Sequence, residues 1–147
     1  MDASRAGEPK LLFPSLAGFY QAVSDLWYPI IRITAGTCLY PHAWPKLHNG
    51  PAAIAAFMAK SGFVPGSFFA YSAIFLETIG ATCIILGLFT RFFAAALAIE
   101  MAVITVYISA QGYMRMEHTL IWGIIFFAIA LRGGGPYSLD RKIGIEL

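Results

Sequence analysis

Charge is what this sequence has least of. Asp, Glu, Lys and Arg make up 12% of its 147 residues, whereas hydrophobic residues make up 59%. A soluble domain is typically about 25% charged, and a small domain leaves much of its surface in water. The composition therefore excludes an ordinary soluble domain and indicates a protein embedded in lipid. The net charge of +2 is too small to indicate nucleic-acid binding.

Cysteine is also scarce, and recognised cofactor motifs are lacking. Cys38 and Cys83 lie within apolar runs and form no Cys-x-x-Cys pair, which argues against a metal centre or a disulfide framework. The sequence has no heme, flavin or iron–sulfur signature. It also lacks the uninterrupted apolar segment of a cleaved secretory signal, so we expect the first spanning helix to direct insertion.

Long apolar runs, in contrast, are abundant. A helix needs about 20 apolar residues to cross a bilayer, and four stretches suit this role, at about 26–43, 66–89, 92–110 and 113–131. The fourth reaches full length if it begins near Tyr113, which places Glu117 and His118 about one turn inside the membrane and is the arrangement we favour. The alternative is a locally thinned bilayer. The predicted fold is all-α, an integral membrane four-helix bundle that forms a single domain over residues 1–147.

The first outer loop contains a short helical segment, "PAAIAAFMAK". Pro51 is suited to the start of a helix, and Gly62 follows its end. We expect this helix to lie in the membrane interface or to fold back onto the bundle. Residues 1–25 are expected to form a tail and surface segment, and residues 132–147 a second tail.

The basic residues predict the orientation of the chain. With four spans, both termini and the turn between the second and third spans share one side. That side carries six basic residues and the other carries three, and the side richer in basic residues is the cytoplasmic one. The six are Arg5, Lys10, Arg91, Arg132, Arg141 and Lys142, and the three are Lys46, Lys60 and Arg115.

Three ionisable residues fall near the middle of three different spans. Arg32 lies in the first, Glu77 in the second and Glu100 in the third. Isolated charges are costly in lipid, so these side chains are expected to face the bundle interior and to pair. One arginine cannot neutralise two carboxylates, so one glutamate is expected to be protonated at neutral pH.

The pattern of small residues supports an inward-facing Glu77. A helical stripe with glycines on it allows close helix packing, and such a stripe on the second span consists of Ala73, Glu77, Gly80, Ile84 and Gly87. Three roles remain open for the buried polar cluster of Arg32, Glu77 and Glu100. It could fix the register of the helices, provide a protonatable site for a quinone or a proton relay, or serve transport.

A second polar group is expected near the outer face. It consists of His42, Lys46, His48, Glu117 and His118. Their spacing matches no recognised metal-ligand pattern, and we predict no metal site. A quinone headgroup presents two carbonyl oxygens that histidine and lysine donors can bind, so these residues are candidate contacts to a quinone or to a partner. No residue is firmly predicted to be catalytic.

The tail "RGGGPYSLDRKIG" is rich in glycine but lacks the spacing of a phosphate-binding loop. We expect a flexible exit from the membrane, in which Asp140 bonds to nearby backbone.

Several of these segments together resemble one family. From about Leu26 to Asp140 the chain is similar to the DoxX family of small four-helix bacterial membrane proteins. The resemblance rests on "IIRITAG", "LYPHAWPKL", "FVPG", "ETIGATCIILGLFTR", "RMEHTLIW" and "GGGPYSLD". Ala43 stands where the family often has glycine, and Glu100 where the family more often has an apolar residue. Glu100 is therefore expected to be a specialisation of this protein.

The resemblance implies a multi-pass protein of the bacterial inner membrane, and the distribution of basic residues predicts that both termini lie in the cytoplasm. The founding members are implied to be subunits of a membrane thiosulfate:quinone oxidoreductase associated with a terminal oxidase. This chain is thus expected to be a quinone-linked subunit of a membrane redox complex, with quinone as the cofactor and other membrane subunits as partners. Two alternatives stay open, a non-catalytic accessory or assembly subunit and a small-solute transporter. The chain carries no autonomous catalytic motif, so its status as an enzyme is open.

Overall fold

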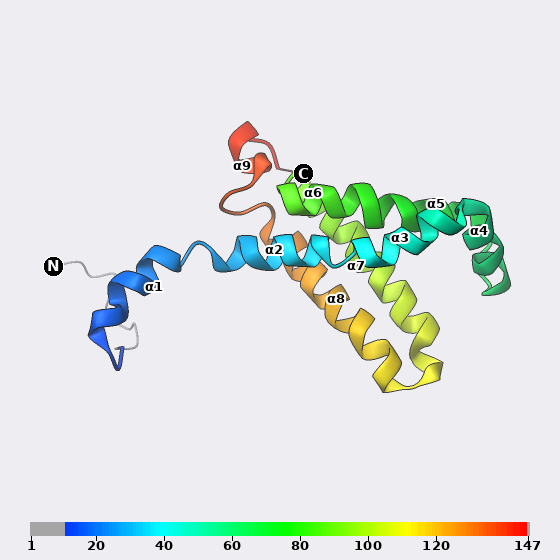
Figure 1. The fold of residues 1–147 in the computed structure, drawn as a ribbon, viewed down its shortest axis with the longest axis horizontal. Helices are drawn as coiled ribbons and strands as arrows, with labels where there is room; N and C mark the ends of the chain where they lie inside the picture. Colours follow the sequence, from blue (N-terminus) through cyan, green and yellow to red (C-terminus); the bar gives the residue numbers. More distant parts are fainter. Residues whose placement is uncertain (1–10, 147) are drawn as a thin grey trace.

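The structure is a computed structural model that describes residues 11–146, so the predicted cytoplasmic residues Arg5 and Lys10 lie outside the described part. The described residues form helices and loops and contain no strand (Figure 1). The all-α prediction is confirmed. In chain order, the elements are η2 (Pro14–Leu16), α1 (Ala17–Val23), α2 (Trp27–Thr37), α3 (Tyr40–Asn49), α4 (Pro51–Lys60), α5 (Gly66–Phe75), η3 (Leu76–Gly80), α6 (Ala81–Leu86), α7 (Thr90–Ile108), η4 (Ser109–Gln111), α8 (Tyr113–Arg132) and α9 (Leu139–Ile143).

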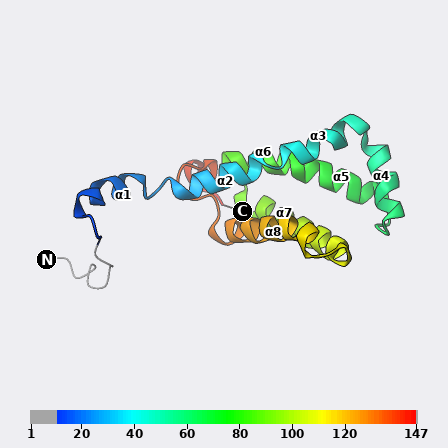
Figure 2. The same cartoon turned by 60° about the horizontal axis from the view of Figure 1, so that its bottom comes forward.

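The helices form two layers. In one layer α2 packs along α6, and α3 continues from α2 beside α5. In the other layer α7 and α8 pair as a hairpin (Figure 2). The layers meet where α7 contacts η3 and α6, and where α8 contacts α2. One end of the bundle therefore gathers the start of α2, the end of α6, the start of α7 and the end of α8.

The first predicted span consists of two helices. α2 ends at Thr37, and α3 begins at Tyr40 after a turn at Cys38 and Leu39. Pro41 explains the break, because proline has no N–H to donate to the carbonyl four residues earlier. The second helix extends to Asn49, so residues such as Lys46, which were expected beyond the span, belong to the same helical rod.

The second predicted span is one continuous helical segment with a π-helical turn in its middle. α5 leads into η3, which is π-helical, and η3 leads into α6. The stripe predicted on this segment is buried along its whole length, at Ala73, Glu77, Gly80, Ile84 and Gly87. The small residues permit close contact, since a Cβ on Gly36 of α2 would lie 2.8 Å from the backbone oxygen of Ala81.

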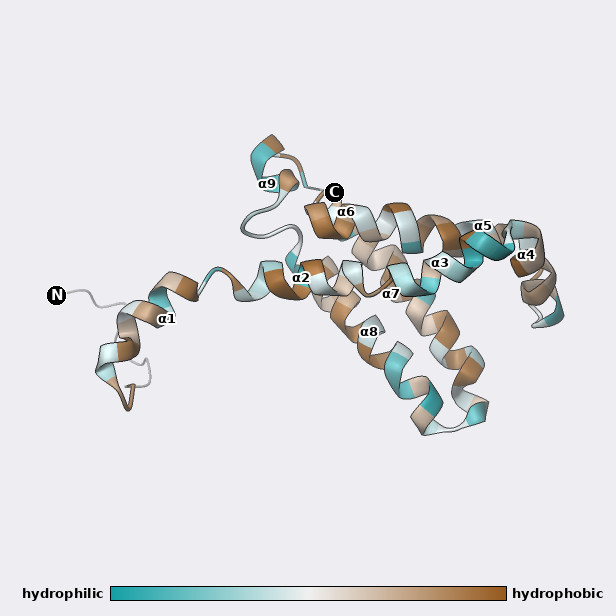
Figure 3. Cartoon of the chain, viewed as in Figure 1, coloured by the Kyte–Doolittle hydropathy of each residue, from teal (hydrophilic) through white to brown (hydrophobic). Residues whose placement is uncertain are grey.

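The outside of the bundle is apolar. The segments Gly66–Leu86, Thr90–Gln111 and Tyr113–Arg132 are each long and hydrophobic enough to cross a membrane. Only 11% of the most apolar part of α8 is buried within the chain, so the rest of that surface needs an apolar surrounding. The chain is an all-α multi-pass membrane protein. Figure 3 shows that α3, unlike α2, carries several hydrophilic residues within this apolar frame.

The short helix of the first loop is present as α4. It runs from Pro51 to Lys60 and packs across α5 (Figure 1). Gly66 allows this close approach, because a Cβ there would lie 2.2 Å from the carbonyl oxygen of Ala55. At the N-terminal side, α1 lies apart from the two layers (Figures 1 and 2).

Candidate functional site

The buried Glu77 is paired with a lysine. Lys46 of α3 forms a salt bridge and hydrogen bond with Oε1 of Glu77. The side chain of Glu77 is 3% exposed and that of Lys46 is 22% exposed. The second carboxylate oxygen, Oε2, is buried and has no hydrogen-bond partner within residues 11–146. Oε1 of Glu77 is thus paired with a cation, whereas Oε2 is left without a hydrogen bond.

Glu77 lies in the π-helical turn. A π turn inserts an extra residue into an α-helix, and such insertions occur frequently at functional sites. The local hydroxyls support the turn, since Thr78 donates to the carbonyl of Ile74 and Thr82 donates to that of Thr78. The turn contacts both α3 and α7, so Glu77 lies at the place where the two layers meet.

Two histidines lie beside this pair. The rings of His42 in α3 and His118 in α8 have their centroids 5.8 Å apart. The indole N–H of Trp122 donates to Nε2 of His118 at 3.0 Å. Because the indole can only donate, Nε2 of this histidine is unprotonated and its Nδ1 carries the hydrogen. His118 therefore offers a hydrogen-bond donor at Nδ1.

A cavity of about 150 Å³ connects these residues. It is enclosed by α3 and the turn before it, the π-helical turn, α7 and α8, and both polar and apolar side chains line it. They are Cys38, Leu39, His42, Lys46, Glu77, Met101, Ile104, His118, Thr119 and Trp122. A cavity of about 150 Å³ can hold a single benzene ring, whereas pockets for drug-sized ligands measure about 300–1,000 Å³. This space suits one ring-sized group.

Glu100 lies on α7, behind the cavity rather than in its wall. Both of its carboxylate oxygens are buried, and neither has a hydrogen-bond partner in the described chain. An unpaired carboxylate is costly in such surroundings, so the neutral acid is the form that this position accommodates.

The structure does not bring Arg32 together with the glutamates, and this part of the predicted cluster is corrected. Arg32 is 1% exposed, and its guanidinium donates to the backbone carbonyls of Gly134, Tyr137 and Ile85, the last two at 3.0 and 3.4 Å. Arg32 is the central residue of α2, and its side chain extends toward the end of α6 and the C-terminal loop rather than toward the π-helical turn. Lys46 takes the place that was expected for Arg32.

Two residues of the predicted outer group lie apart from the cavity. His48 stacks on Trp44, with ring centroids 4.3 Å apart, and Glu117 is half-buried on α8 with no hydrogen bond or ion pair to the rest of residues 11–146. The structure therefore unites Glu77 with His42, Lys46 and His118, although the sequence placed these residues in two separate groups.

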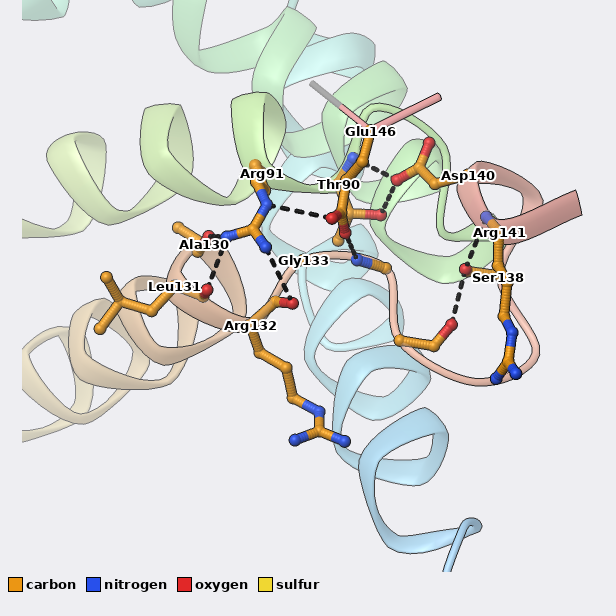
Figure 4. Close-up of polar contacts among 12 residues, drawn as sticks. Thr90, Arg91, Ala130, Leu131, Arg132, Gly133, Ser138, Asp140, Arg141 and Glu146 are labelled. Atoms are coloured by element: carbon orange, nitrogen blue, oxygen red, sulfur yellow. Dashed lines mark hydrogen bonds and ion pairs between the residues drawn. The ribbon is translucent and has the colours of Figure 1, made fainter. Parts of the chain in front are cut away.

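The C-terminal tail forms an ordered clasp with the start of α7, shown in Figure 4. Asp140 accepts hydrogen bonds from the backbone N–H groups of Phe89 and Thr90 at 2.7 and 2.9 Å, and from the hydroxyl of Thr90 at 2.6 Å. It thus satisfies helix N–H groups that would otherwise lack partners. The expected flexible exit with local bonding is wrong, because the partners of Asp140 lie 50 and 51 residues away along the chain.

Arg91 closes the same end of the bundle. Its guanidinium donates to the carbonyls of Ala130, Leu131 and Arg132 at the end of α8, and it forms a 3.2 Å ion pair with Glu146 (Figure 4). These carbonyls have no partners within their own helix. Arg32, Asp140 and Arg91 are therefore structural residues that join the two layers through the tail.

The comparison with known families identifies the chain. A family model described as DoxX matches residues 28–110, more than half of the sequence. The chain belongs to the DoxX family. The match contains Arg32, Lys46, Glu77 and Glu100 and ends before α8, so His118 lies outside it. No curated protein and no solved structure matches this DoxX protein.

Proposed function

We propose that this DoxX-family protein is a quinone-linked subunit of a membrane redox complex, and that the cavity beside Glu77 holds the quinone headgroup. The proposal rests on one observation: Lys46, His42 and His118 line the same ring-sized cavity inside a membrane protein. A quinone is a lipid-soluble ring with two carbonyl acceptors. The cavity offers hydrogen-bond donors for these acceptors and apolar walls for the ring.

The donors are suited to carbonyl oxygens. Lys46 is half-buried, and its ammonium has donors beyond the one used by Glu77. His118 presents its Nδ1–H, because Trp122 occupies Nε2. Met101 and Ile104 supply apolar wall. The volume accommodates the ring but not an isoprenoid tail, so the tail would extend into lipid.

A bound quinone would supply two-electron chemistry, with a proton taken up at each carbonyl oxygen. The chain can support this with its own groups. Glu77 holds Lys46 in place through Oε1 and has a free Oε2, while Glu100 provides a second buried carboxyl nearby. Electrons would come from a partner subunit, because the sequence has no heme, flavin or iron–sulfur signature.

The orientation of the chain is part of the proposal. Arg91, Arg132, Arg141 and Lys142 gather at the end that carries the tail clasp, and basic residues mark the cytoplasmic side. Both termini would then face the cytoplasm of a bacterial inner membrane. Labelling of single cysteines placed at residue 141 and at residue 60 would test this, and the proposed orientation requires only the residue 60 site to react from outside the cell.

The test of quinone binding is direct. The protein is purified in mild detergent, bound quinone is extracted and quantified, and a short-chain quinone is titrated into the emptied protein. We expect Lys46→Met to weaken binding about tenfold or more, since a hydrogen bond to a charged donor contributes about 1.5–3 kcal/mol. His118→Phe removes the second donor without leaving a buried charge unpaired.

Lys60→Met serves as the matched control, because Lys60 is an exposed lysine at the end of α4. It should bind quinone as the unmodified protein does. If no quinone is extracted and none binds, the redox proposal fails. The accessory-subunit alternative would then be favoured, with the Lys46–Glu77 pair fixing helix register.

A further inference from the structure

The tail clasp borders a second, open cavity at the end of the bundle away from α4 (Figure 1). It measures about 450 Å³, within the range of ligand pockets. The end of α8, the loop after it and α9 form its walls, which include Arg132, Ser138, Asp140, Arg141 and Glu146. The end of α8 is also the end of an apolar span, so this cavity lies where the membrane meets water.

The two acids in this cavity are already engaged. Asp140 accepts three hydrogen bonds from Phe89 and Thr90. Glu146 accepts from the backbone N–H of Gly134 at 2.6 Å and pairs with Arg91. The negative charges of Asp140 and Glu146 are therefore compensated by their partners within the clasp.

The two arginines in the cavity wall are not engaged in this way. Figure 4 shows the side chains of Arg132 and Arg141 extending away from the bonded network. Neither guanidinium has a hydrogen bond or ion pair within the described residues, although the backbone N–H of Arg141 donates to Ser138 at 3.2 Å. With the acids engaged, the charge left for a ligand is positive.

Arg132 is held in place by stacking. Its guanidinium carbon lies 5.0 Å from the ring centroid of Trp27 and 4.7 Å from that of Tyr28. Stacking on an aromatic face fixes the plane of a guanidinium and leaves the N–H groups at its edge free, and this edge matches phosphate geometry. The site is thus partly organised before any anion binds.

Exposed apolar side chains lie at and next to the wall of the cationic cavity. Ile145 lines it and Trp27 stacks on Arg132, while Leu131, Tyr137 and Ile143 are chain neighbours of lining residues. All five are more than half exposed. An apolar rim would not add to the binding of a soluble phosphate compound. A phospholipid, in contrast, places its acyl chains against apolar side chains and its phosphate against arginine. Aromatic residues such as Trp27 are also typical of the membrane interface.

We propose that this cavity binds the headgroup of an anionic phospholipid, with the phosphodiester on Arg132 and Arg141 and the acyl chains along the end of α8. The site is independent of the quinone cavity. Binding there would fasten the tail clasp to the membrane surface, because α9 and the end of α8 would hold one lipid between them.

Lipid titration of the purified, delipidated protein tests the proposal. Binding of phosphatidylglycerol and of phosphatidylcholine is measured by native mass spectrometry, with inorganic phosphate as a separate arm. We expect phosphatidylglycerol to bind about tenfold or more tightly than phosphatidylcholine, since each arginine near anionic lipid contributes about 1 kcal/mol. The preference should weaken at high salt.

Arg132→Gln with Arg141→Gln should abolish the preference, and Arg141→Gln alone should reduce it. Arg141 is exposed and its side chain makes no hydrogen bond or ion pair within the described residues, so Arg141→Gln should fold normally. Arg132→Lys keeps a cation over the aromatic rings and should retain part of the preference. Lys60→Gln changes a lysine of α4, which lies at the end of the bundle away from the clasp (Figure 1), and should behave as the unmodified protein does.

Three results would overturn the proposal. The first is equal binding of the two lipids, and the second is an unchanged preference in the double variant. The third is competition by inorganic phosphate at millimolar concentration, which would assign the site to a soluble phosphate compound.

Discussion

Lys46 and Glu77 form an ion pair that joins α3 to a π-helical turn in the middle of the bundle. Within residues 11–146 this is one of two salt bridges, and the other, between Arg91 and Glu146, lies in the tail clasp. The first pair is nearly enclosed and borders a cavity.

Removing one partner of the Lys46–Glu77 pair should destabilise the folded protein. Lys46→Met leaves the carboxylate of Glu77 buried without a partner, and loss of one member of a buried pair destabilises by about 3–5 kcal/mol. Replacing both residues, as Lys46→Met with Glu77→Leu, should recover most of this loss. Thermal unfolding of the four proteins of this double-mutant cycle, in one detergent, measures the coupling. Additive effects of the two substitutions would contradict a direct pair.

Glu100 should tolerate neutralisation better than Glu77 does. Its carboxylate oxygens are buried and have no partner within residues 11–146, so Glu100→Gln replaces a neutral acid by an amide of the same shape. We expect a change in unfolding free energy of less than about 1 kcal/mol, whereas Glu77→Gln loses a charged hydrogen bond and should cost about 1.5–3 kcal/mol. Parallel unfolding curves compare the two. A larger loss for Glu100→Gln would indicate a bound cation or donor at Glu100.

The clasp should stabilise the whole bundle. Thr90→Val removes the hydroxyl that donates to Asp140 but keeps the backbone N–H groups that also bond to it. We expect a loss of about 1–3 kcal/mol. Limited proteolysis should cut the tail of this variant faster than that of the unmodified protein. Thr37→Val provides the control, because the hydroxyl of Thr37 bonds only to Ile33 in its own helix.

Gly87 should be required both for its backbone conformation and for the space beside it. Its φ is +68°, and a Cβ there would lie 2.7 Å from an Arg32 guanidinium nitrogen and 2.5 Å from Ser138. Gly112 has a φ of +100° with no atom within 4 Å of an added Cβ. Both Gly→Ala variants are strained in the backbone, so the additional loss of thermal stability at Gly87 measures the packing of Arg32. Equal losses would contradict this packing.

The sequence predicts the membrane class, the helices and the buried stripe around Glu77 because these follow from hydropathy and helical periodicity. It does not predict which charges meet. Arg32 was paired with Glu77 on estimated depth, whereas its side chain extends to the carbonyls of the tail. Lys46 was expected in the outer group because it follows the predicted span 26–43, yet α3 continues to Asn49 and carries Lys46 to Glu77.

Local sequence patterns also could not predict the clasp between the C-terminal tail and the start of α7. Asp140 lies 50 residues from Thr90, and no periodicity links a helix start to a tail so distant in the chain. The two partners do lie in recognisable motifs, "GLFTR" with Phe89 and Thr90 and "YSLD" with Asp140. Nothing in either motif indicates that it contacts the other. Residues that cap distant helix ends become visible only when the helices are packed.

Occupancy of the cavity beside Glu77 by a quinone ring can be measured at Cys38. Cys38 lines this cavity and is exposed, so its alkylation by a maleimide reports on occupancy when Cys83 is replaced by serine. We predict that a saturating short-chain quinone slows the labelling of Cys38 about tenfold, and that Lys46→Met loses this protection while Lys60→Met retains it. Labelling at the same rate with and without quinone would contradict the account.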